Sequence, residues 1–386
     1  MLSIAEIICG ASVFFIGYVF FGYGICLRIL LFLKRISVDG DQPELMLVPP
    51  TVTVLLTVSD EVSKVEGRLD NLFSLQYPKD KLQIVVASDG STDGTNELVQ
   101  TLLKAPTDKL VVCGEKNGKT AAQNASMLFA TGEIVVLTDV DSRFSIDFLI
   151  QMIKVFQDPS VGGATSPVLF TVEDNPIASA QGYYWRYEQK LRHLESSLGF
   201  LAVASGQCLA FRKGLFREMP NFVGDDCVIP LDIVSQGYKF VNVVGAIATD
   251  VIETDPQREF RSRVRMTQRN WTGTWRYPHL LNPLRFPGVA FGLWSHKILR
   301  WLSPFYILIG SGAVFVDFLV NGASIVFGLW VALVVVALGR AIVGGAFIRV
   351  PAIELFFSFL VANAGFLFGV CKAVMGRRIT SYKAGQ

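Results

Sequence analysis

Residues 133–142 of this 386-residue chain read EIVVLTDVDS, an apolar run that ends in two aspartates. The run predicts a strand buried on both faces, because it has no polar face to turn toward water. Alternate residues of an extended chain point the same way, so Asp139 and Asp141 converge on one point at the end of the strand. Two carboxylates at one point suit Mg²⁺ or Mn²⁺, with water and substrate phosphates as the remaining ligands. A solvated loop is the alternative for this pair.

Short apolar runs alternate with helical patterns on the N-terminal side of this segment. Strands are predicted at residues 52–58, 82–88, 109–113 and 133–139, and helices at 64–75, 95–104 and 118–130. This alternation is typical of an α/β fold with a mainly parallel sheet covered on both faces. Such sheets bind ligands at the carboxyl ends of their strands, so functional residues are expected directly after each strand. No G-x-G-x-x-G follows the first strand and no G-x-x-x-x-G-K-[ST] occurs, so neither a dinucleotide fold nor a P-loop is supported.

Acidic residues follow two more of these strands. Asp60 and Glu61 come after the first strand, and Asp89 opens the segment DGSTDGT after the second. Carboxylates that meet at one edge of a sheet repel one another unless a cation or hydrogen-bond donors lie among them. A cation and a ligand rich in hydroxyl and amide groups would suit this edge, although the segment after Asp89 also fits a simple turn.

An acidic pair and a run of cations follow in the second half of the polar stretch. Asp225 and Asp226 precede an apolar stretch, where acids often serve only as helix caps. The alternative is that one of them is a general base, which must reach an acceptor hydroxyl. Several arginines then run into two tryptophans just before the apolar tail: Arg261, Arg263, Arg265, Arg269, Trp271 and Trp275. These cations either contact anionic lipid or serve the site.

The composition indicates a membrane protein. Hydrophobic residues make up 51% of the chain, and the mean hydropathy is +0.43. Charged residues make up only 18%, whereas about a quarter of the residues of a soluble protein are charged. The net charge of +2 offers no basic excess that would attract nucleic acid. Six cysteines without a C-x-x-C spacing argue against a zinc site or a disulfide framework.

The apolar residues gather at the two ends of the chain. Residues 7–27 carry no charge and are followed by Lys34 and Arg35, which predicts an uncleaved anchor with the following domain in the cytoplasm. The expected organisation is an N-terminal transmembrane anchor, a cytoplasmic domain, an interfacial segment and two or three C-terminal transmembrane helices, at residues 1–35, 38–277, 278–300 and 301–375. The domain would therefore lie at the inner face of the plasma membrane, in contact with its lipids.

The C-terminal part contains three apolar runs, at residues 301–316, 318–339 and 355–371. Asp317 and Asn321 are expected to mark the turn between the first two. Three crossings would place four cations outside, against the positive-inside rule: Lys372, Arg377, Arg378 and Lys383. One run is therefore expected to be re-entrant or to remain on one side.

Taken in order, these pieces resemble the membrane-integrated family 2 glycosyltransferases that build surface polysaccharides. The resemblance covers nearly the whole chain, and its motifs are VTVLLTVSDE, VVASDGSTDGT, KNGKTAAQN, VLTDVDS, SGQCLAFRKG, GDD with the later QGYK, RVRMTQRNWTG and HKILRWLSP. It implies the GT-A fold, a single nucleotide-sugar-binding α/β domain. Two departures stand out: Asp60 occupies the usual place of an Asn, and Asn270 stands where processive members carry Arg before Trp271. The choice between processive and single transfer stays open.

The resemblance also implies roles for individual residues. The donor nucleotide sugar, expected to be a UDP-sugar, would be bound by Asp60, Glu61, Asp89, Ser91, Lys119 and Asp139. Asp139 and Asp141 would hold the metal, and Asp226 would be the base, beside Asp225. The acceptor and diphosphate side would be formed by Gly206, Gln207, Arg265, Arg269 and Trp271.

The implied reaction is a single displacement that inverts the configuration of the sugar. Mg²⁺ or Mn²⁺ would neutralise charge on the departing diphosphate while Asp226 deprotonates a hydroxyl of a lipid-linked or growing glycan. Three alternatives remain: a metal-dependent phosphatase or nucleotidyltransferase, a transferase of one sugar to polyprenyl phosphate, and a non-catalytic subunit of a polysaccharide synthase. Buried carboxylates argue against the last of these, because a scaffold does not need them.

Overall fold

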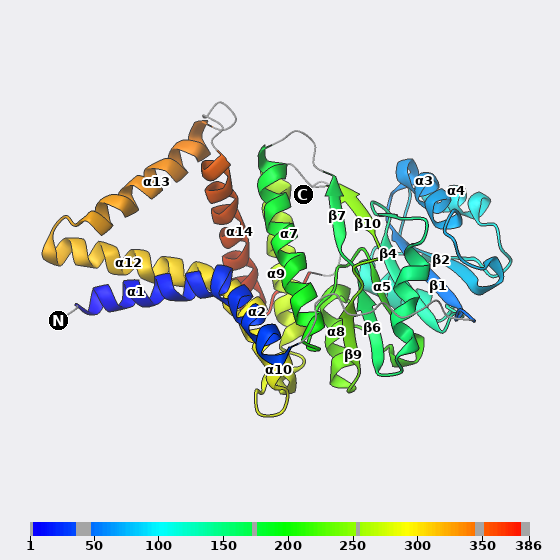
Figure 1. Ribbon diagram of the computed structural model, residues 1–386. Coiled ribbons are helices and arrows are strands. Elements are labelled where there is room, and N and C mark those ends of the chain that lie inside the picture. The colour runs from blue at the N-terminus through cyan, green and yellow to red at the C-terminus, as the bar shows by residue number, and fades with distance from the viewer. Residues whose placement is uncertain (1–2, 36–47, 172–175, 252–254, 344–350, 380–386) are drawn as a thin grey trace.

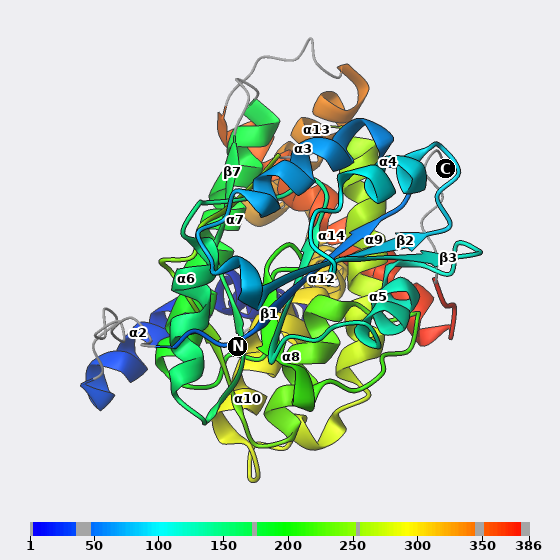
Figure 2. The ribbon, with the colours of Figure 1, turned by 90° about the vertical axis from the view of Figure 1, so that its right-hand side faces the viewer.

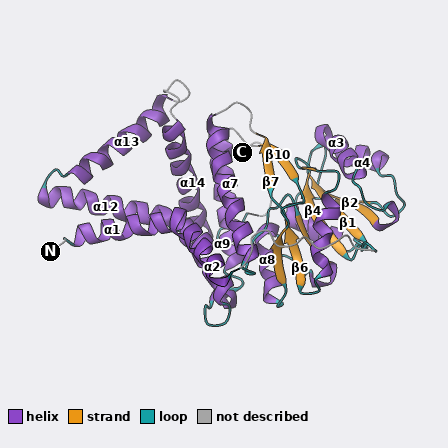
Figure 3. Cartoon of the chain, viewed as in Figure 1, coloured by secondary structure: helices purple, strands orange, loops and turns teal. Residues whose placement is uncertain are grey.

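The computed structural model describes residues 3–35, 48–171, 176–251, 255–343 and 351–379. Two sheets lie among these residues (Figure 3). The larger contains β1 Val52–Val58, β2 Leu82–Asp89, β3 Lys109–Cys113, β4 Ile134–Asp139, β6 Val161–Thr165, β8 Leu209–Arg212 and β9 Lys239–Asn242. The smaller contains β5 Arg143–Phe144, β7 Val168–Thr171 and β10 Ala248–Val251.

The larger sheet is mainly parallel, as predicted. Its strand order is β3-β2-β1-β4-β8-β6-β9, and only β8 runs antiparallel to its neighbours β4 and β6. In the register, Val58 of β1 lies beside Ser88 of β2, and Thr57 lies beside Asp139 of β4. The strands β1, β2 and β4 therefore end at one edge of the sheet, and the segments that follow them lie next to one another.

Helices cover both faces of this sheet, which explains the continuous apolar character of its strands. The helices of the domain are α3 Val62–Phe73, α4 Thr95–Leu102, α5 Lys119–Met127, α6 Phe148–Ile153, α7 Pro176–Ser197, α8 Asp225–Ser235 and α9 Pro256–Thr274. One core cluster joins the sheet to α3 and α6. The second joins it to α5 and α8 and extends to Leu293, Trp301 and Phe366. This second core links the sheet to the apolar helices without a break.

The remaining helices form the apolar part of the chain. They are α1 Ile4–Gly17, α2 Tyr23–Lys34, α10 Pro287–Gly292, α11 Leu299–Trp301, α12 Ser303–Asn321, α13 Ile325–Val343 and α14 Pro351–Val374, with the π-helical turns Tyr18–Gly22 and Leu293–Ile298. By length and apolarity, three helices among the described residues could cross a membrane: Ile4–Lys34, Ser303–Asn321 and Ile353–Val374. In Figure 1, α1 and α12 lie side by side and extend away from the sheet.

The turn after α12 does not lie where the sequence suggested. Asp317 is inside the helix and accepts a hydrogen bond from Asn321 Nδ2 at 2.7 Å, one helical turn later. The chain leaves the helix at Gly322, whose φ of 85° is the left-handed conformation that glycine adopts without strain. The two polar residues thus pair along one helix face instead of forming the turn.

Helix α14 packs along α9 and α7, crosswise to α12 (Figure 1). Glycines allow this close approach, because a Cβ at Gly365 would lie 2.6 Å from Cβ of Arg263, and one at Gly369 would lie 2.6 Å from Cβ of Thr267. Beyond the helix, Gln268 Nε2 of α9 donates to the carbonyl of Arg377. The end of the described chain therefore lies against α9, in the domain that contains the sheet. Figure 2 shows this domain after a turn of 90°.

Candidate active site

A pocket opens at the carboxyl ends of β1, β2 and β4, between the sheet, α8 and α9. Eleven of the residues expected from the sequence line it: Glu61, Asp89, Lys119, Asp139, Asp141, Gly206, Gln207, Asp225, Asp226, Arg265 and Arg269. Asp60, Ser91 and Trp271 lie outside its lining. Segments separated by more than 200 residues in the chain thus meet in one place, as parallel strand ends require.

Asp60 and Ser91 hold two loops together at the rim. The backbone N–H of Asp60 donates to Ser91 Oγ at 3.1 Å, and its carboxylate accepts from the Thr92 N–H at 2.8 Å and pairs with Lys116. The hydrogen bond from Lys116 and that from Thr92 lower the pKa of Asp60. Asp60 also has a φ of 55°, a left-handed conformation that is uncommon for a residue with a Cβ. The loops are therefore fixed by several bonds that use the Asp60 carboxylate.

Asp89 is buried and bonded to the loop before α5. Its carboxylate oxygens accept hydrogen bonds from the N–H groups of Asn117 at 2.9 Å and of Gly118 at 3.0 Å. Gly118 has a φ of 93°, which lets the loop turn its N–H groups toward this carboxylate. Asp89 thereby positions Lys119, the first residue of α5.

Lys119 lies between two carboxylates. Its Nζ is 2.7 Å from Asp139 Oδ1 and 3.1 Å from Asp225 Oδ2. Burial opposes the charge of the amine, but Asp139 and Asp225 outweigh it and raise the pKa of Lys119. Burial likewise raises the pKa of Asp139, although Lys119 partly offsets this effect. The ion triad is how this edge accommodates the like charges that the sequence places there.

Asp141 is half-exposed and faces the open side of the pocket. It forms an ion pair with Lys64, at 2.8 Å, and Lys64 also lies 3.2 Å from Glu61. Among the described residues, no three His, Cys, Asp or Glu side chains meet as a closed metal site. Mg²⁺ and Mn²⁺ commonly take only one or two carboxylates and complete their shell with substrate phosphates and water. The carboxylates of Asp139 and Asp141, which are 33% and 52% exposed, fit such an ion.

The acidic pair at the start of α8 is electrostatically asymmetric. Asp225 accepts from Gln123 Nε2 at 2.8 Å and pairs with Lys119. Burial alone would raise the pKa of Asp225, but Lys119 and the hydrogen bond from Gln123 lower it below its ordinary value. Burial and the neighbouring charge of Asp225 instead raise the pKa of Asp226. Environments that push two carboxyl pKa values apart are typical of a pair with distinct acid–base roles.

Helix α9 contributes two arginines, Arg265 and Arg269, to the pocket and turns Trp271 away from it. Arg269 Nη2 donates to Thr120 Oγ1 at 2.7 Å and to the carbonyl of Val223, so it joins α9 to α5 and to the loop before α8. Trp271, two residues later, faces another side of the helix. It packs 5.8 Å from Trp275 and 6.1 Å from Trp301, measured between ring centroids. In this arrangement neither Trp271 nor Trp275 lines the pocket.

Two residues of the site, Lys64 and Arg192, carry no signal in the sequence. Lys64 of α3 pairs with Asp141, whereas Lys116, the first residue of the KNGKTAAQN motif, pairs with Asp60. Arg192 of α7 also lines the pocket, and its Nη1 donates to Ser205 Oγ at 2.6 Å. The pattern of α7 alone is that of an amphipathic helix, and only the packing brings Arg192 to the site.

The mainly parallel sheet with helices on both faces is a GT-A fold. Residues 53–219 match the model of glycosyl transferase family 2. The structure also resembles that of a mannosyltransferase from Pyrobaculum calidifontis, solved in complex with GDP-Man and Mn²⁺. The TM-score is 0.70 over 96% of this chain and 100% of that chain, at 21% identity. Residues 53–219 are thus similar to the glycosyltransferases of family 2.

Two curated relatives match a larger part of the chain. An N-acetylglucosaminyltransferase of Bradyrhizobium diazoefficiens is 20% identical over 303 residues, which are 74% of this chain and 61% of that protein. A poly-beta-1,6-N-acetyl-D-glucosamine synthase of Staphylococcus aureus is 24% identical over 275 residues, which are 65% of this chain and 64% of that protein. The chain thus spans less than two thirds of the length of these relatives.

Proposed function

We propose that the chain is an inverting, metal-dependent glycosyltransferase that moves a sugar from a nucleotide-sugar donor to a lipid-linked or growing glycan at a membrane surface. The observation that carries this proposal is the meeting of Asp141, the Lys119 triad and Asp226 in one pocket. A phosphatase or nucleotidyltransferase would need a two-metal carboxylate cluster, for which the described residues offer no candidate. The names of the relatives support a hexose or N-acetylhexosamine as the transferred sugar.

Each residue has a task in this proposal. Asp139 and Asp141 hold Mg²⁺ or Mn²⁺, which supplies positive charge to the diphosphate of the donor. Lys119 and Arg269 add fixed positive charge on the diphosphate side, which favours departure of the nucleotide. Asp226 accepts the proton of the attacking hydroxyl, because its raised pKa gives it more basicity than an ordinary aspartate. Asp225 stays ionised beside Lys119 and sets the charge around Asp226.

The remaining donor contacts would come from the rim. The loops fixed by Asp60, Ser91 and Asp89 would bind the base and ribose of the nucleotide. Glu61 lines the same pocket. Gly206 and Gln207 line the acceptor side, where the absence of a Cβ at Gly206 leaves room next to Lys119. Arg265 faces the pocket from α9. Trp271 supports this wall through packing with Trp301.

The proposal extends to the organisation in the membrane. Residues 38–277 would form the catalytic domain on the cytoplasmic side of the inner membrane, residues 1–35 the anchor, residues 278–300 an interfacial segment and residues 301–375 the C-terminal apolar helices. Three helices of sufficient length and apolarity support the membrane location. Membrane lipids are then structural partners, and the donor arrives from the cytoplasm.

The first test is release of nucleotide diphosphate by the full chain in detergent, across UDP-, GDP- and dTDP-sugars, with Mn²⁺, Mg²⁺ or EDTA and membrane lipid extract as acceptor. We expect one donor to be turned over only with metal. Asp141→Ala should lower turnover by roughly two to four orders of magnitude, in keeping with the loss of a metal ligand at the reacting diphosphate. Asp158→Ala removes another half-exposed aspartate outside the pocket and should leave the rate unchanged. Metal-independent turnover by Asp141→Ala would refute the assigned metal role.

A further inference from the structure

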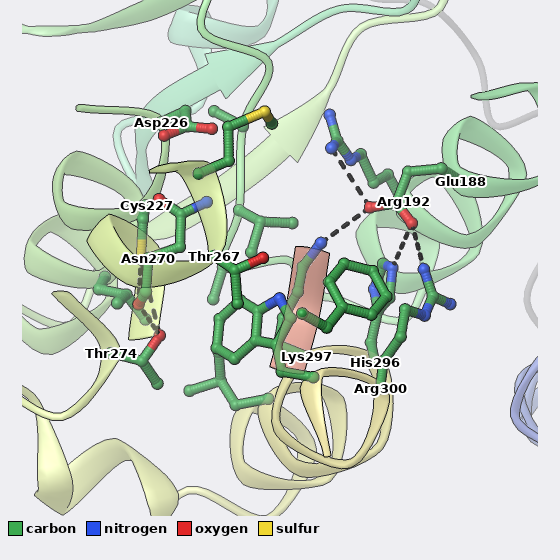
Figure 4. A pocket seen from close by; sticks show the side chains of 18 of the residues that line it. Glu188, Arg192, Asp226, Cys227, Thr267, Asn270, Thr274, His296, Lys297 and Arg300 are labelled. Atoms are coloured by element: carbon green, nitrogen blue, oxygen red, sulfur yellow. Dashed lines mark hydrogen bonds and ion pairs between the residues drawn. The ribbon is translucent and has the colours of Figure 1, made fainter. Parts of the chain in front are cut away.

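A second cavity continues from the active site toward the apolar helices. Asp226, Arg192 and Asn270 line both the site and this cavity. Its far wall is formed by α7, α9, the π-helical turn Leu293–Ile298, α11 and α14. In Figure 4, Asp226 lies on one side of the cavity and the ionic groups around Glu188 lie on the other. A ligand that reaches the base from the membrane side would therefore pass these groups.

The ionic groups surround a buried carboxylate. Glu188 Oε1 accepts from Lys297 Nζ at 2.8 Å, and Oε2 accepts from Arg300 Nη1 at 2.6 Å. Arg192 Nη2 lies 3.3 Å from Oε1. Burial alone would raise the pKa of Glu188, but His296, Lys297 and Arg300 hold it well below its usual range. Glu188 is thus an anion that contacts Arg192, Lys297 and Arg300.

His296 joins a second carboxylate to the cluster. Its Nε2 is 2.8 Å from Glu188 Oε2, and its Nδ1 is 2.6 Å from Glu195 Oε1. Glu195 also accepts from Tyr23 Oη at 2.7 Å. Both nitrogens of His296 are therefore occupied by the cluster, which ties α2 to α7.

The charge of the cluster does not balance. The described cluster contains two carboxylates, Glu188 and Glu195, against three permanent cations, Arg192, Lys297 and Arg300. Glu188, Glu195, Arg192, His296 and Arg300 are each no more than 8% exposed. Arg192 Nε is buried and has no hydrogen-bond partner among the residues that the structure describes. Buried excess charge of this kind is costly unless an anion joins it.

We propose that this cavity binds the phosphate-bearing part of the acceptor, so that the acceptor is a lipid-linked saccharide whose phosphate lies beside Arg192 and Lys297 while its hydroxyl lies at Asp226. The inference rests on the proposed transferase function and names its acceptor class. The separation of base and cations across the cavity supports it, because the nucleophile and the anionic group of such an acceptor are different parts of one molecule (Figure 4). Trp301 and Phe366 give the cavity an apolar wall beside the cations, which suits the start of a lipid chain.

The test measures binding and transfer with the full chain in detergent. The acceptor probes are a polyprenyl-diphosphate-linked saccharide, the same saccharide without the lipid and phosphate, and inorganic diphosphate. We expect the lipid-linked probe to bind at least ten times more tightly than the free saccharide. Lys297→Gln should raise the Kd and KM of the lipid-linked probe about tenfold, and Lys297→Arg should restore much of the loss. Arg285→Gln, an exposed cation outside the cavity, is the control.

Binding of nucleotide diphosphate with Mn²⁺ and slow hydrolysis of the donor are measured on the same variants. If both occur but the free saccharide binds as tightly as the lipid-linked probe, the acceptor assignment is wrong while the transferase function stands. If inorganic diphosphate binds as tightly as the lipid-linked probe, the cavity recognises free phosphate, and the lipid-linked assignment is equally overturned. A chain that neither binds nucleotide nor hydrolyses any donor refutes the proposed function itself.

Discussion

At the scale of single residues, the site depends on how one lysine divides two neighbouring aspartates. Lys119 pairs with Asp225 and not with Asp226, although the two acids are adjacent in the chain. The pKa of Asp225 is therefore lowered, whereas burial and the neighbouring charge of Asp225 raise the pKa of Asp226. A single ion pair thus decides which member of the pair is suited to accept a proton.

This division predicts a pH profile. Transfer requires ionised Asp226, so the rate should fall on the acid side at a pH above that expected for an ordinary aspartate, because the pKa of Asp226 is raised. Asp226→Asn should lower transfer by roughly 10²- to 10⁴-fold at neutral pH, the usual contribution of a general base. Nucleotide binding, measured by titration calorimetry, should be retained in this variant.

Asp225→Asn provides the matched comparison. It removes the like charge that raises the pKa of Asp226, so the acid limb of any remaining activity should move to lower pH. An acid limb that stays in place in Asp225→Asn would show that another group controls the profile.

At the scale of elements, α14 is attached to the catalytic domain through small residues. Gly365 and Gly369 are four positions apart and lie on one helix face against α9, in the spacing that permits close helix contact. Helix α9 also carries Arg269, which lines the active site. A shift of α14 that moves α9 would therefore move Arg269 as well. Ile379, just beyond α14, lines the pocket as well.

Gly369→Ala tests this contact. The new Cβ would lie 2.6 Å from Cβ of Thr267 and 2.9 Å from the carbonyl oxygen of Val264, so the helices must separate. We expect a loss of about 1–3 kcal/mol in stability, the usual cost of overpacking, measured as thermal unfolding in detergent, together with weaker transfer. Gly312→Ala on α12 meets no atom within 4 Å and should be neutral. Equal stability of the two variants would contradict the tight contact.

At the scale of the whole molecule, the packing of α14 addresses a conflict in the charge pattern. Three crossings by the C-terminal runs would put Arg377 and Arg378 opposite the catalytic domain. Instead, the carbonyl of Arg377 accepts from Gln268, and the Arg378 guanidinium lies 4.4 Å from the ring centroid of Phe222. The end of α14 therefore lies on the side of the domain, in agreement with the positive-inside rule. We infer that the C-terminal part crosses the membrane twice, which returns the end of α14 to the side of the domain.

Cysteine labelling in intact cells tests this topology. In a background without the six native cysteines, Ala323→Cys lies in the turn between α12 and α13 and should react with an impermeant maleimide from outside. Met375→Cys, at the exposed end of α14, should react only after lysis. Reaction of Met375→Cys in intact cells would contradict the placement of this chain end on the side of the domain.

Much of this protein follows from local sequence. Apolar runs of β-branched residues specify the strands of the parallel sheet, and the acids that follow them, such as Asp89 and Asp141, reach one edge because parallel strands end together. The structure confirms the fold and brings most of the expected site residues into one pocket, while their roles remain proposals.

Other features depend on contacts between distant segments. The choice of Asp225 as the partner of Lys119, the turning of Trp271 toward Trp301, and the cation cluster around Glu188 each join segments that are far apart in the chain. Hydropathy also could not indicate that α14 packs along α9, because it measures the apolarity of a segment and not what that segment packs against. The sequence by itself therefore determined the sheet and its acidic edge, whereas only the tertiary structure decided the charge partners and the place of the last helix.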